Sequence, residues 1–130
     1  MLKGIDHIEL VVKDIELFIS FFEKLGFEII RRTEHHKGSA ELKLPGKEQI
    51  IFELHCIEEY ENPGINHIAF ACDDINKTYK SMMDQGIMFE KAPYHASATG
   101  RIIANFRDPD GRRMQLVDAR SDEYIKGERI

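Results

Sequence analysis

The chain repeats a short motif, and this repeat limits the folds open to it more than any other feature does. The segment "GIDHIEL" begins at Gly4, and "GINHIAF" begins sixty residues later at Gly64. The same offset aligns further pairs of residues: Asp14 with Asp74, Ile15 with Ile75, and Gly26 with Gly86. Self-similarity at a fixed offset indicates an internal duplication, so we expect two copies of one structural unit.

Each copy is expected to begin with a strand and a helix. An apolar run precedes an aspartate that can cap the start of a helix, and a glycine twelve residues after the aspartate can end that helix. The apolar runs are Ile8 to Val12 in the first copy and Ile68 to Cys72 in the second. We expect each helix to lay one apolar face on a sheet, and we predict that the phenylalanines of the first helix are core. The apolar residues at helical spacing are Phe18, Phe21, Phe22 and Leu25 in the first copy, and Ile75, Tyr79, Met82 and Met83 in the second.

Three short strand segments follow each helix. They are "FEIIRRT", "SAELKL" and "QIIFELHC" in the first copy, and "IMFEK", "GRIIANF" and "RRMQLVD" in the second. The predicted fold class is α+β, with two βαβββ modules forming a curved, mixed β-sheet cavity. We expect a single domain over residues 1–130, with module 1 at about 4–56, module 2 at about 64–118, and a charged C-terminal tail at 119–130.

The repeated histidines are predicted to point away from the helices. Side chains alternate along a strand, so the apolar residues of each first strand face the helix while His7 and His67 face the opposite side. In the last strands, "FEL" aligns with "MQL", which places Glu53 and Gln115 on that same opposite face. Each copy therefore supplies one histidine and one side-chain oxygen donor.

These four side chains can form a metal site if both copies contribute to one concave surface. Two imidazole nitrogens and two oxygens, without a thiolate, suit a borderline divalent cation and leave positions for water or substrate. The pattern leaves Ni²⁺, Co²⁺, Zn²⁺, Mn²⁺ and Fe²⁺ open as the metal. The predicted ligands are His7, Glu53, His67 and Gln115.

Composition argues against several kinds of partner and location. The net charge is −5 and the basic residues are scattered, which argues against nucleic-acid binding. No stretch approaches the roughly 20 apolar residues that cross a membrane, and the N-terminus does not resemble a signal peptide. The two cysteines, Cys56 and Cys72, are too few for a disulfide framework. We therefore expect a soluble cytoplasmic protein.

These motifs resemble the vicinal oxygen chelate superfamily, which includes glyoxalase I, methylmalonyl-CoA epimerase, extradiol dioxygenases, fosfomycin-modifying enzymes and bleomycin-binding proteins. The resemblance covers about residues 4–118 and is carried by "DHIELVV", "IIFELH", "NHIAFACDDI" and "FRDPDGRRMQLVD". It implies metal ligands at His7, Glu53, His67 and Gln115, the same positions that strand alternation selects.

Gln115 departs from the glyoxalase I pattern. Members of that type usually have a glutamate there, which both binds the metal and moves the substrate proton. A carboxamide can bind a metal through its oxygen but cannot accept a proton as a carboxylate does. We therefore predict Glu53 as the catalytic base, with His55 on the same face as a candidate relay. Epimerases of the family have a glutamine at one oxygen position, so Gln115 weakens the lyase assignment more than the metal site.

The resemblance implies a metal-dependent lyase or isomerase of the glyoxalase I (lactoylglutathione lyase-like) type, acting through an enediolate on a small carbonyl or thiol-adduct substrate. A methylmalonyl-CoA epimerase-like racemase is one alternative. A non-catalytic protein binding a bleomycin-type drug or a metabolite is another, although such relatives generally lack metal ligands. An iron-dependent oxygenase is a third. We also expect a homodimer, with the cavity either within one chain or across the two subunits.

Overall fold

A computed structural model describes residues 1–34, 38–96 and 100–119. These residues form eight strands and two helices, and the chain divides into two compact units. Of the described residues, the first unit contains residues 7–66, and the second contains residues 1–6 and those from 67 to 119. From residue 120 on, the predicted C-terminal tail lies outside the described residues. Neither helix in the described ranges is both long enough and apolar enough to cross a membrane.

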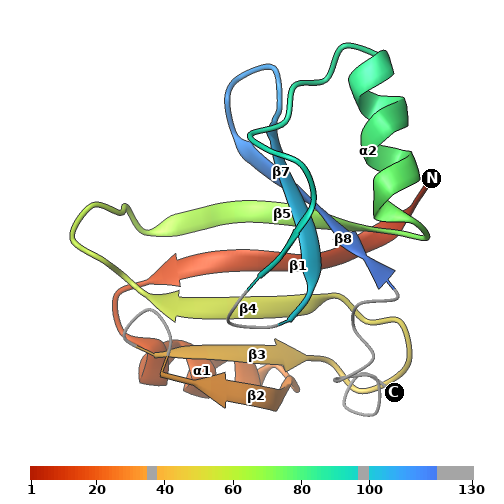
Figure 1. The fold of residues 1–130 in the computed structure, drawn as a ribbon. Coiled ribbons are helices and arrows are strands. Elements are labelled where there is room, and N and C mark those ends of the chain that lie inside the picture. The colour runs from red at the N-terminus through yellow and green to blue at the C-terminus, as the bar shows by residue number, and fades with distance from the viewer. Residues whose placement is uncertain (35–37, 97–99, 120–130) are drawn as a thin grey trace. The chain divides into compact units, whose positions relative to one another are not determined.

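The first unit is built from one helix and a four-stranded mixed sheet. The strands run in the order β2-β3-β4-β1, with β1 and β4 parallel and the other neighbours antiparallel (Figure 1). Strand β1 begins in the second unit and ends in the first. The elements are β1 (Leu2–Val12), α1 (Ile15–Lys24), β2 (Glu28–Thr33), β3 (Ser39–Lys43) and β4 (Ile51–Cys56).

The second unit repeats this arrangement. Its strands run in the order β5-β8-β7-β6, again with the first and last strands of the copy, β5 and β8, parallel. The predicted fold class, α+β with two βαβββ modules, is therefore confirmed. The elements are β5 (Gly64–Cys72), whose residues 64–66 belong to the first unit, α2 (Ile75–Asp84), β6 (Tyr94–His95), β7 (Ile102–Arg107) and β8 (Arg113–Asp118).

Both helices begin at the predicted aspartates. The Oδ1 atom of Asp14 accepts a hydrogen bond from the Leu17 amide at 3.1 Å. The Oδ1 atom of Asp74 accepts from the amides of Asn76 and Lys77 at 3.1 and 3.3 Å. A side-chain oxygen at this position satisfies amides that have no partner within the helix, so the same residue fixes the helix start in both copies.

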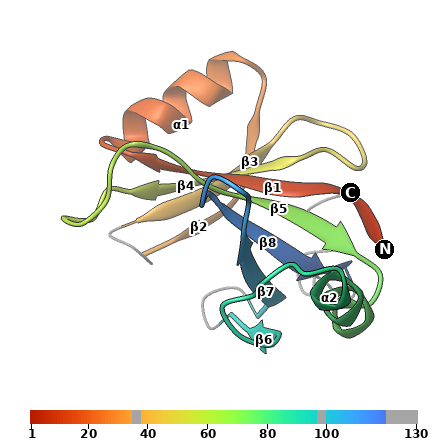
Figure 2. The same cartoon turned by 90° about the horizontal axis from the view of Figure 1, so that it is seen from above.

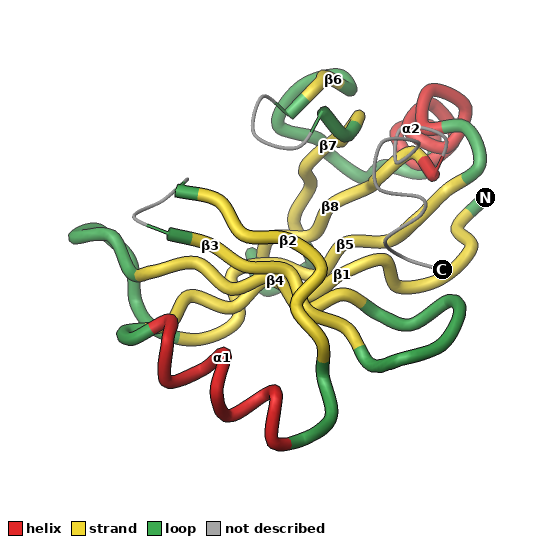
Figure 3. The backbone as a smooth tube through the Cα atoms, turned by 90° about the horizontal axis from the view of Figure 1, so that it is seen from below, coloured by secondary structure: helices red, strands yellow, loops and turns green. Residues whose placement is uncertain are grey.

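Each helix covers one face of its own sheet, which leaves the opposite face for other uses. Helix α1 lies on one side of the strands of the first unit (Figure 2), and α2 packs against β7 and β8 in the second (Figure 3). The alternation predicted for the core-facing side chains is confirmed. The buried core residues are Val12, Ile19, Phe22, Ala40, Leu42 and Leu54 in the first unit, and Cys72, Ile75, Ala104, Phe106 and Leu116 in the second.

The face that α1 presents to its sheet differs from the prediction. Phe22 is buried, as is Ile19 one turn earlier, but Phe21 is 55% exposed and Leu25 is equally exposed. Consecutive helical residues are turned by 100° about the axis, so a face centred on Ile19 and Phe22 leaves Phe21 and Leu25 outside the contact. The prediction that all the phenylalanines of this helix are core is therefore wrong.

The sixth strand also differs from the prediction. "IMFEK" does not form a strand, and Phe89 makes only an isolated bridge to Phe106. The strand β6 begins instead directly after Pro93. A proline has no amide hydrogen to donate to a ladder and restricts the residue before it, so pairing starts beyond it. Phe89 contributes to the core, where its ring lies 4.8 Å from that of Tyr79.

Candidate functional site

His7 and Glu53 lie together in the first unit, as predicted. The parallel pairing of β1 and β4 sets Glu53 opposite Glu9, two residues from His7 and on the same face of the sheet. The Nε2 atom of His7 lies 3.7 Å from Oε1 of Glu53, and His7 is only 2% exposed. An imidazole nitrogen and a carboxylate oxygen at this separation are suitable ligands for one divalent cation.

His67 and Gln115 occupy the equivalent positions in the second unit. Strands β5 and β8 are parallel, with Ala69 opposite Gln115. Alternation along β5 puts His67 on the same face as Ala69, so the histidine and the amide share the face that is turned away from α2. Both side chains are buried. The histidine and the oxygen donor of each unit thus lie on one face, as the sequence predicted, and the structure adds that their two strands are direct neighbours.

Two further carboxylates share the face of Glu53. Glu41 on β3 lies directly opposite Glu53, which in turn lies opposite Glu9 on β1. Three acidic side chains therefore form a row across three neighbouring strands. Glu41 is 7% exposed. This face of the first unit is therefore rich in carboxylates.

Sequence reasoning did not select Glu41 as a candidate site residue, although a signal was present. In "SAELKL", Ala40 and Leu42 are apolar and Glu41 stands between them, so alternation along the strand already turns Glu41 away from the helix. What alternation cannot supply is the residue opposite it. That partner, Glu53, follows from the antiparallel register of β3 and β4.

His55 is held between two carboxylates. Its Nε2 atom lies 2.9 Å from Oε2 of Glu61, and its Nδ1 atom lies 3.4 Å from Oε1 of Glu9. Glu61 belongs to the connector between the two copies, and its Oε1 atom also accepts a hydrogen bond from the Glu58 amide at 2.8 Å. The histidine therefore ties the connector to the face of the sheet that carries Glu53.

This environment makes His55 a cation at neutral pH. Burial lowers the pKa of His55, but the carboxylates of Glu9 and Glu61 outweigh that effect and raise it to about 9. For Glu9 the two effects have the opposite signs. Burial raises the pKa of Glu9, but the hydrogen bond and the positive charge of His55 outweigh burial and bring this pKa below its ordinary value. Since both ring nitrogens face carboxylates and the ring is already protonated, His55 is unsuited to the predicted role of a proton relay for Glu53.

The charge on His55 predicts a loss of stability at alkaline pH. Because the folded pKa of about 9 exceeds the ordinary value of 6.5, the contribution is complete below pH 6.5 and is lost as the pH rises to and through 9. We expect the free energy of unfolding of the wild type to fall by roughly 3 kcal/mol relative to His55→Gln between pH 6 and pH 10. Denaturant unfolding of both proteins measures this, and a difference that stays constant with pH would contradict it.

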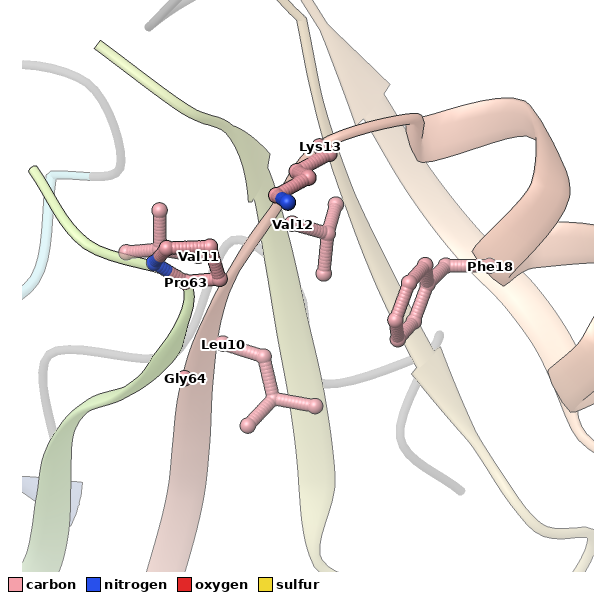
Figure 4. Close-up of a pocket in the computed structure, with 7 residues that line it drawn as sticks. All are labelled: Leu10, Val11, Val12, Lys13, Phe18, Pro63 and Gly64. Atoms are coloured by element: carbon pink, nitrogen blue, oxygen red, sulfur yellow. The ribbon is translucent and has the colours of Figure 1, made fainter. Parts of the chain in front are cut away.

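A small apolar pocket of the first unit lies on the helix side of the sheet. Its volume is about 220 Å³, and Phe18 of α1 forms part of its wall (Figure 4). Leu10 and Val12 also line it, and both belong to the side of β1 that packs with α1. The pocket is therefore separate from the face that carries His7 and Glu53. Its lining residues are Leu10, Val11, Val12, Lys13, Phe18, Pro63 and Gly64.

Comparison with protein families gives a match over most of the chain. Residues 4–116 match the family model described as Glyoxalase/Bleomycin resistance protein/Dioxygenase superfamily. The matched region begins at the first copy of the repeat and ends in β8, so it includes both copies and all four predicted metal ligands.

Individual proteins agree with this match. A probable lactoylglutathione lyase of Synechocystis is 27% identical over 126 residues, which cover 88% of this chain and 95% of that protein. The uncharacterized protein YwbC of Bacillus subtilis is 31% identical, with 89% and 98% covered. Among solved structures, a Streptomyces coelicolor methylmalonyl-CoA epimerase in complex with 2-nitronate-propionyl-CoA superposes with a TM-score of 0.75 at 22% identity, covering 91% of this chain and 98% of that one. This last likeness is one of fold.

Proposed function

Because the chain belongs to the Glyoxalase/Bleomycin resistance protein/Dioxygenase superfamily, we propose that it is a metal-dependent lyase or isomerase of the glyoxalase I type. Its substrate in this proposal is a small carbonyl compound or its adduct with a thiol, and the reaction proceeds through an enediolate. The observation that carries the proposal is the pair formed by the buried His7 and the half-buried Glu53, set within a row of carboxylates.

The proposed metal ligands are His7 and Glu53 from the first unit and His67 and Gln115 from the second. The donor set fits a borderline divalent cation, because it combines imidazole nitrogens with oxygens and includes no thiolate. Such an ion would stabilise the negative charge that develops on two neighbouring substrate oxygens. It would so lower the barrier to removing the proton from the carbon next to the carbonyl group. Ni²⁺, Co²⁺, Zn²⁺, Mn²⁺ and Fe²⁺ are the candidates.

Glu53 is the proposed base. A carbon acid beside a carbonyl loses its proton too slowly without a positioned acceptor, and a carboxylate can serve as one. Gln115 lacks this basicity, and the carboxylate of Glu9 is committed to His55. In the lyase reaction one base suffices, because it takes a proton from one carbon of the adduct and returns it to the neighbouring carbon.

A second candidate function, a methylmalonyl-CoA epimerase-like racemase, is favoured by Gln115, because epimerases of the family have a glutamine at one oxygen position. Inversion at a carbon atom by two groups requires one to remove the proton from one face and another to deliver a proton to the opposite face. Glu41 and Glu53 are direct cross-strand partners on one face of the sheet, so both carboxylates would approach a substrate from the same side. The second acid-base group of an epimerase would therefore have to be a residue other than Glu41.

A single series of measurements tests the proposal. The protein is purified without added metal, analysed for its elements, titrated with each candidate cation, and then incubated in D₂O with substrates of two kinds. We expect one ion per chain and proton exchange in an adduct of a dicarbonyl compound and a thiol. Exchange only next to the carbonyl of an acyl thioester would favour the epimerase. Metal binding with neither exchange would favour a non-catalytic binding protein, or an oxygenase if oxygen is consumed with Fe²⁺.

The oligomeric state and compartment belong to the same proposal. We propose a homodimer in the cytoplasm, and the exposed apolar residues of α1, Phe21 and Leu25, support burial of this helix by a second copy. Sedimentation of the purified chain gives its mass in solution. A monomer across the concentrations used for assays would rule out the dimer.

A further inference from the structure

Two amide side chains face each other in the second unit. Asn105 on β7 and Gln115 on β8 are direct partners in the antiparallel register, and they are 5% and 6% exposed. The Nε2 atom of Gln115 donates a hydrogen bond to Oδ1 of Asn105 at 3.0 Å. In a buried site such a bond fixes the rotation of the Gln115 amide, because breaking it leaves a polar group unsatisfied.

This rotation determines whether Gln115 can bind a cation. An amide offers a metal ion only its oxygen, whereas its NH₂ group carries positive partial charge and repels the ion. Because Nε2 of Gln115 donates its hydrogen bond to Asn105, Oε1 is the end of the amide that points away from Asn105. The reverse rotation would present the NH₂ group at the place where a ligand oxygen is needed.

Asn105 is itself anchored. Its Nδ2 atom donates to the Tyr94 hydroxyl at 3.2 Å, so its two ends are assigned to two different partners. Tyr94 is opposite Ile103 in the pairing of β6 and β7, and its side chain packs against the buried cluster of Ala69, Ile103 and Val117. Tyr94, Asn105 and Gln115 therefore form a chain of hydrogen bonds across the three neighbouring strands β6, β7 and β8.

The first unit carries a different pair of side chains at these positions, and the difference has a chemical consequence. The residues at the corresponding positions are Glu41 and Glu53, which are also direct cross-strand partners. A carboxylate has two equivalent oxygens and presents one of them in either rotation. An amide has one oxygen, so only the copy that carries glutamine needs a partner that sets its rotation.

We infer that Asn105, anchored by Tyr94, is a positioning residue that keeps Oε1 of Gln115 turned toward the metal. The inference rests on the proposed metal site and adds to it a residue outside the ligand set. It also explains how a glutamine can be a metal ligand where related lyases carry a glutamate. A carboxylate presents an oxygen in either rotation, whereas the single oxygen of Gln115 is oriented by Asn105 on the neighbouring strand.

A double-mutant cycle between residues 105 and 115 tests the inference. We expect Asn105→Leu to weaken divalent-metal binding by about 10- to 100-fold, the range typical of a lost partner of a metal ligand. Asn105→Asp should keep at least the wild-type affinity, because its carboxylate still accepts from Nε2 of Gln115 and its negative charge attracts the cation. In the Gln115→Glu background Asn105→Leu should have no effect, since either carboxylate oxygen can bind. Calorimetric titration with Zn²⁺ or Co²⁺ gives each affinity.

Side-chain amide NMR of the metal-free protein provides a second readout. We expect slowly exchanging Gln115 NH₂ protons in the wild type and in Asn105→Asp, and fast exchange in Asn105→Leu. Tyr94→Phe removes one hydroxyl and serves if Asn105→Leu does not fold; it should weaken metal binding in the Gln115 protein and leave it unchanged in the Gln115→Glu background. Equal loss in both backgrounds, or no loss in either, overturns the inference while the metal site stands. A wild type that binds no ion overturns the proposed function, and the inference with it.

Discussion

Replacing Glu53 with glutamine is expected to abolish proton exchange while leaving the ion bound. An amide keeps an oxygen that can bind the metal but loses the basicity of the carboxylate, so the chemical step fails and the metal site survives. We expect the rate of substrate exchange in D₂O to fall by at least about 100-fold, the lower range for loss of a general base. Elemental analysis of the same sample establishes that the metal is retained.

Glu41→Gln is the matched control for this substitution, because Glu41 carries the same carboxylate and lies directly opposite Glu53 on the same face of the sheet. A lyase with Glu53 as its only base should retain most of its activity in Glu41→Gln. Loss of activity in both variants would show that Glu41 also takes part in the reaction. Full turnover by Glu53→Gln, together with loss in Glu41→Gln, would show that Glu41 is the base and that our assignment of Glu53 is wrong.

Removing either histidine ligand should have the other large effect. We expect His7→Ala and His67→Ala each to lower divalent-metal affinity by more than the roughly 10- to 100-fold that follows loss of an outer partner, because each variant loses a direct nitrogen donor. Calorimetric titration measures the affinity and the number of ions per chain. If all four ligands bind one ion, both substitutions must affect that same ion.

His95 supplies the control for these variants. It is exposed at the end of β6, so His95→Ala tests whether surface imidazoles account for any of the metal binding.

Retention of one tightly bound ion in His67→Ala would mean that the first unit binds metal alone, and the proposed four-ligand site would fail. Retention of wild-type affinity in both His7→Ala and His67→Ala would remove the metal site altogether.

Strand alternation and the internal repeat were sufficient to predict most of the candidate site. The duplication predicted two βαβββ modules, and the side-chain period of two placed His7 and Glu53 on the face opposite the helix. The same reasoning placed His67 and Gln115 on the corresponding face of the second unit. The capping aspartates were also predictable, because a helix start depends on a few neighbouring residues. These features are local or periodic, and a sequence records them directly.

Tertiary structure decided which side chains meet across strands. Glu41 opposite Glu53, Asn105 opposite Gln115, and Glu61 beside His55 all depend on register or on the path of a connector. Register is set by how the apolar faces pack and how the turns close, and no periodicity within a single strand reveals it. The sequence alone thus determined the fold class and the face on which the candidate ligands lie. Packing determined the neighbours of these residues. The carboxylates of Glu9 and Glu61 keep His55 protonated, and Asn105 holds the Gln115 amide in one rotation.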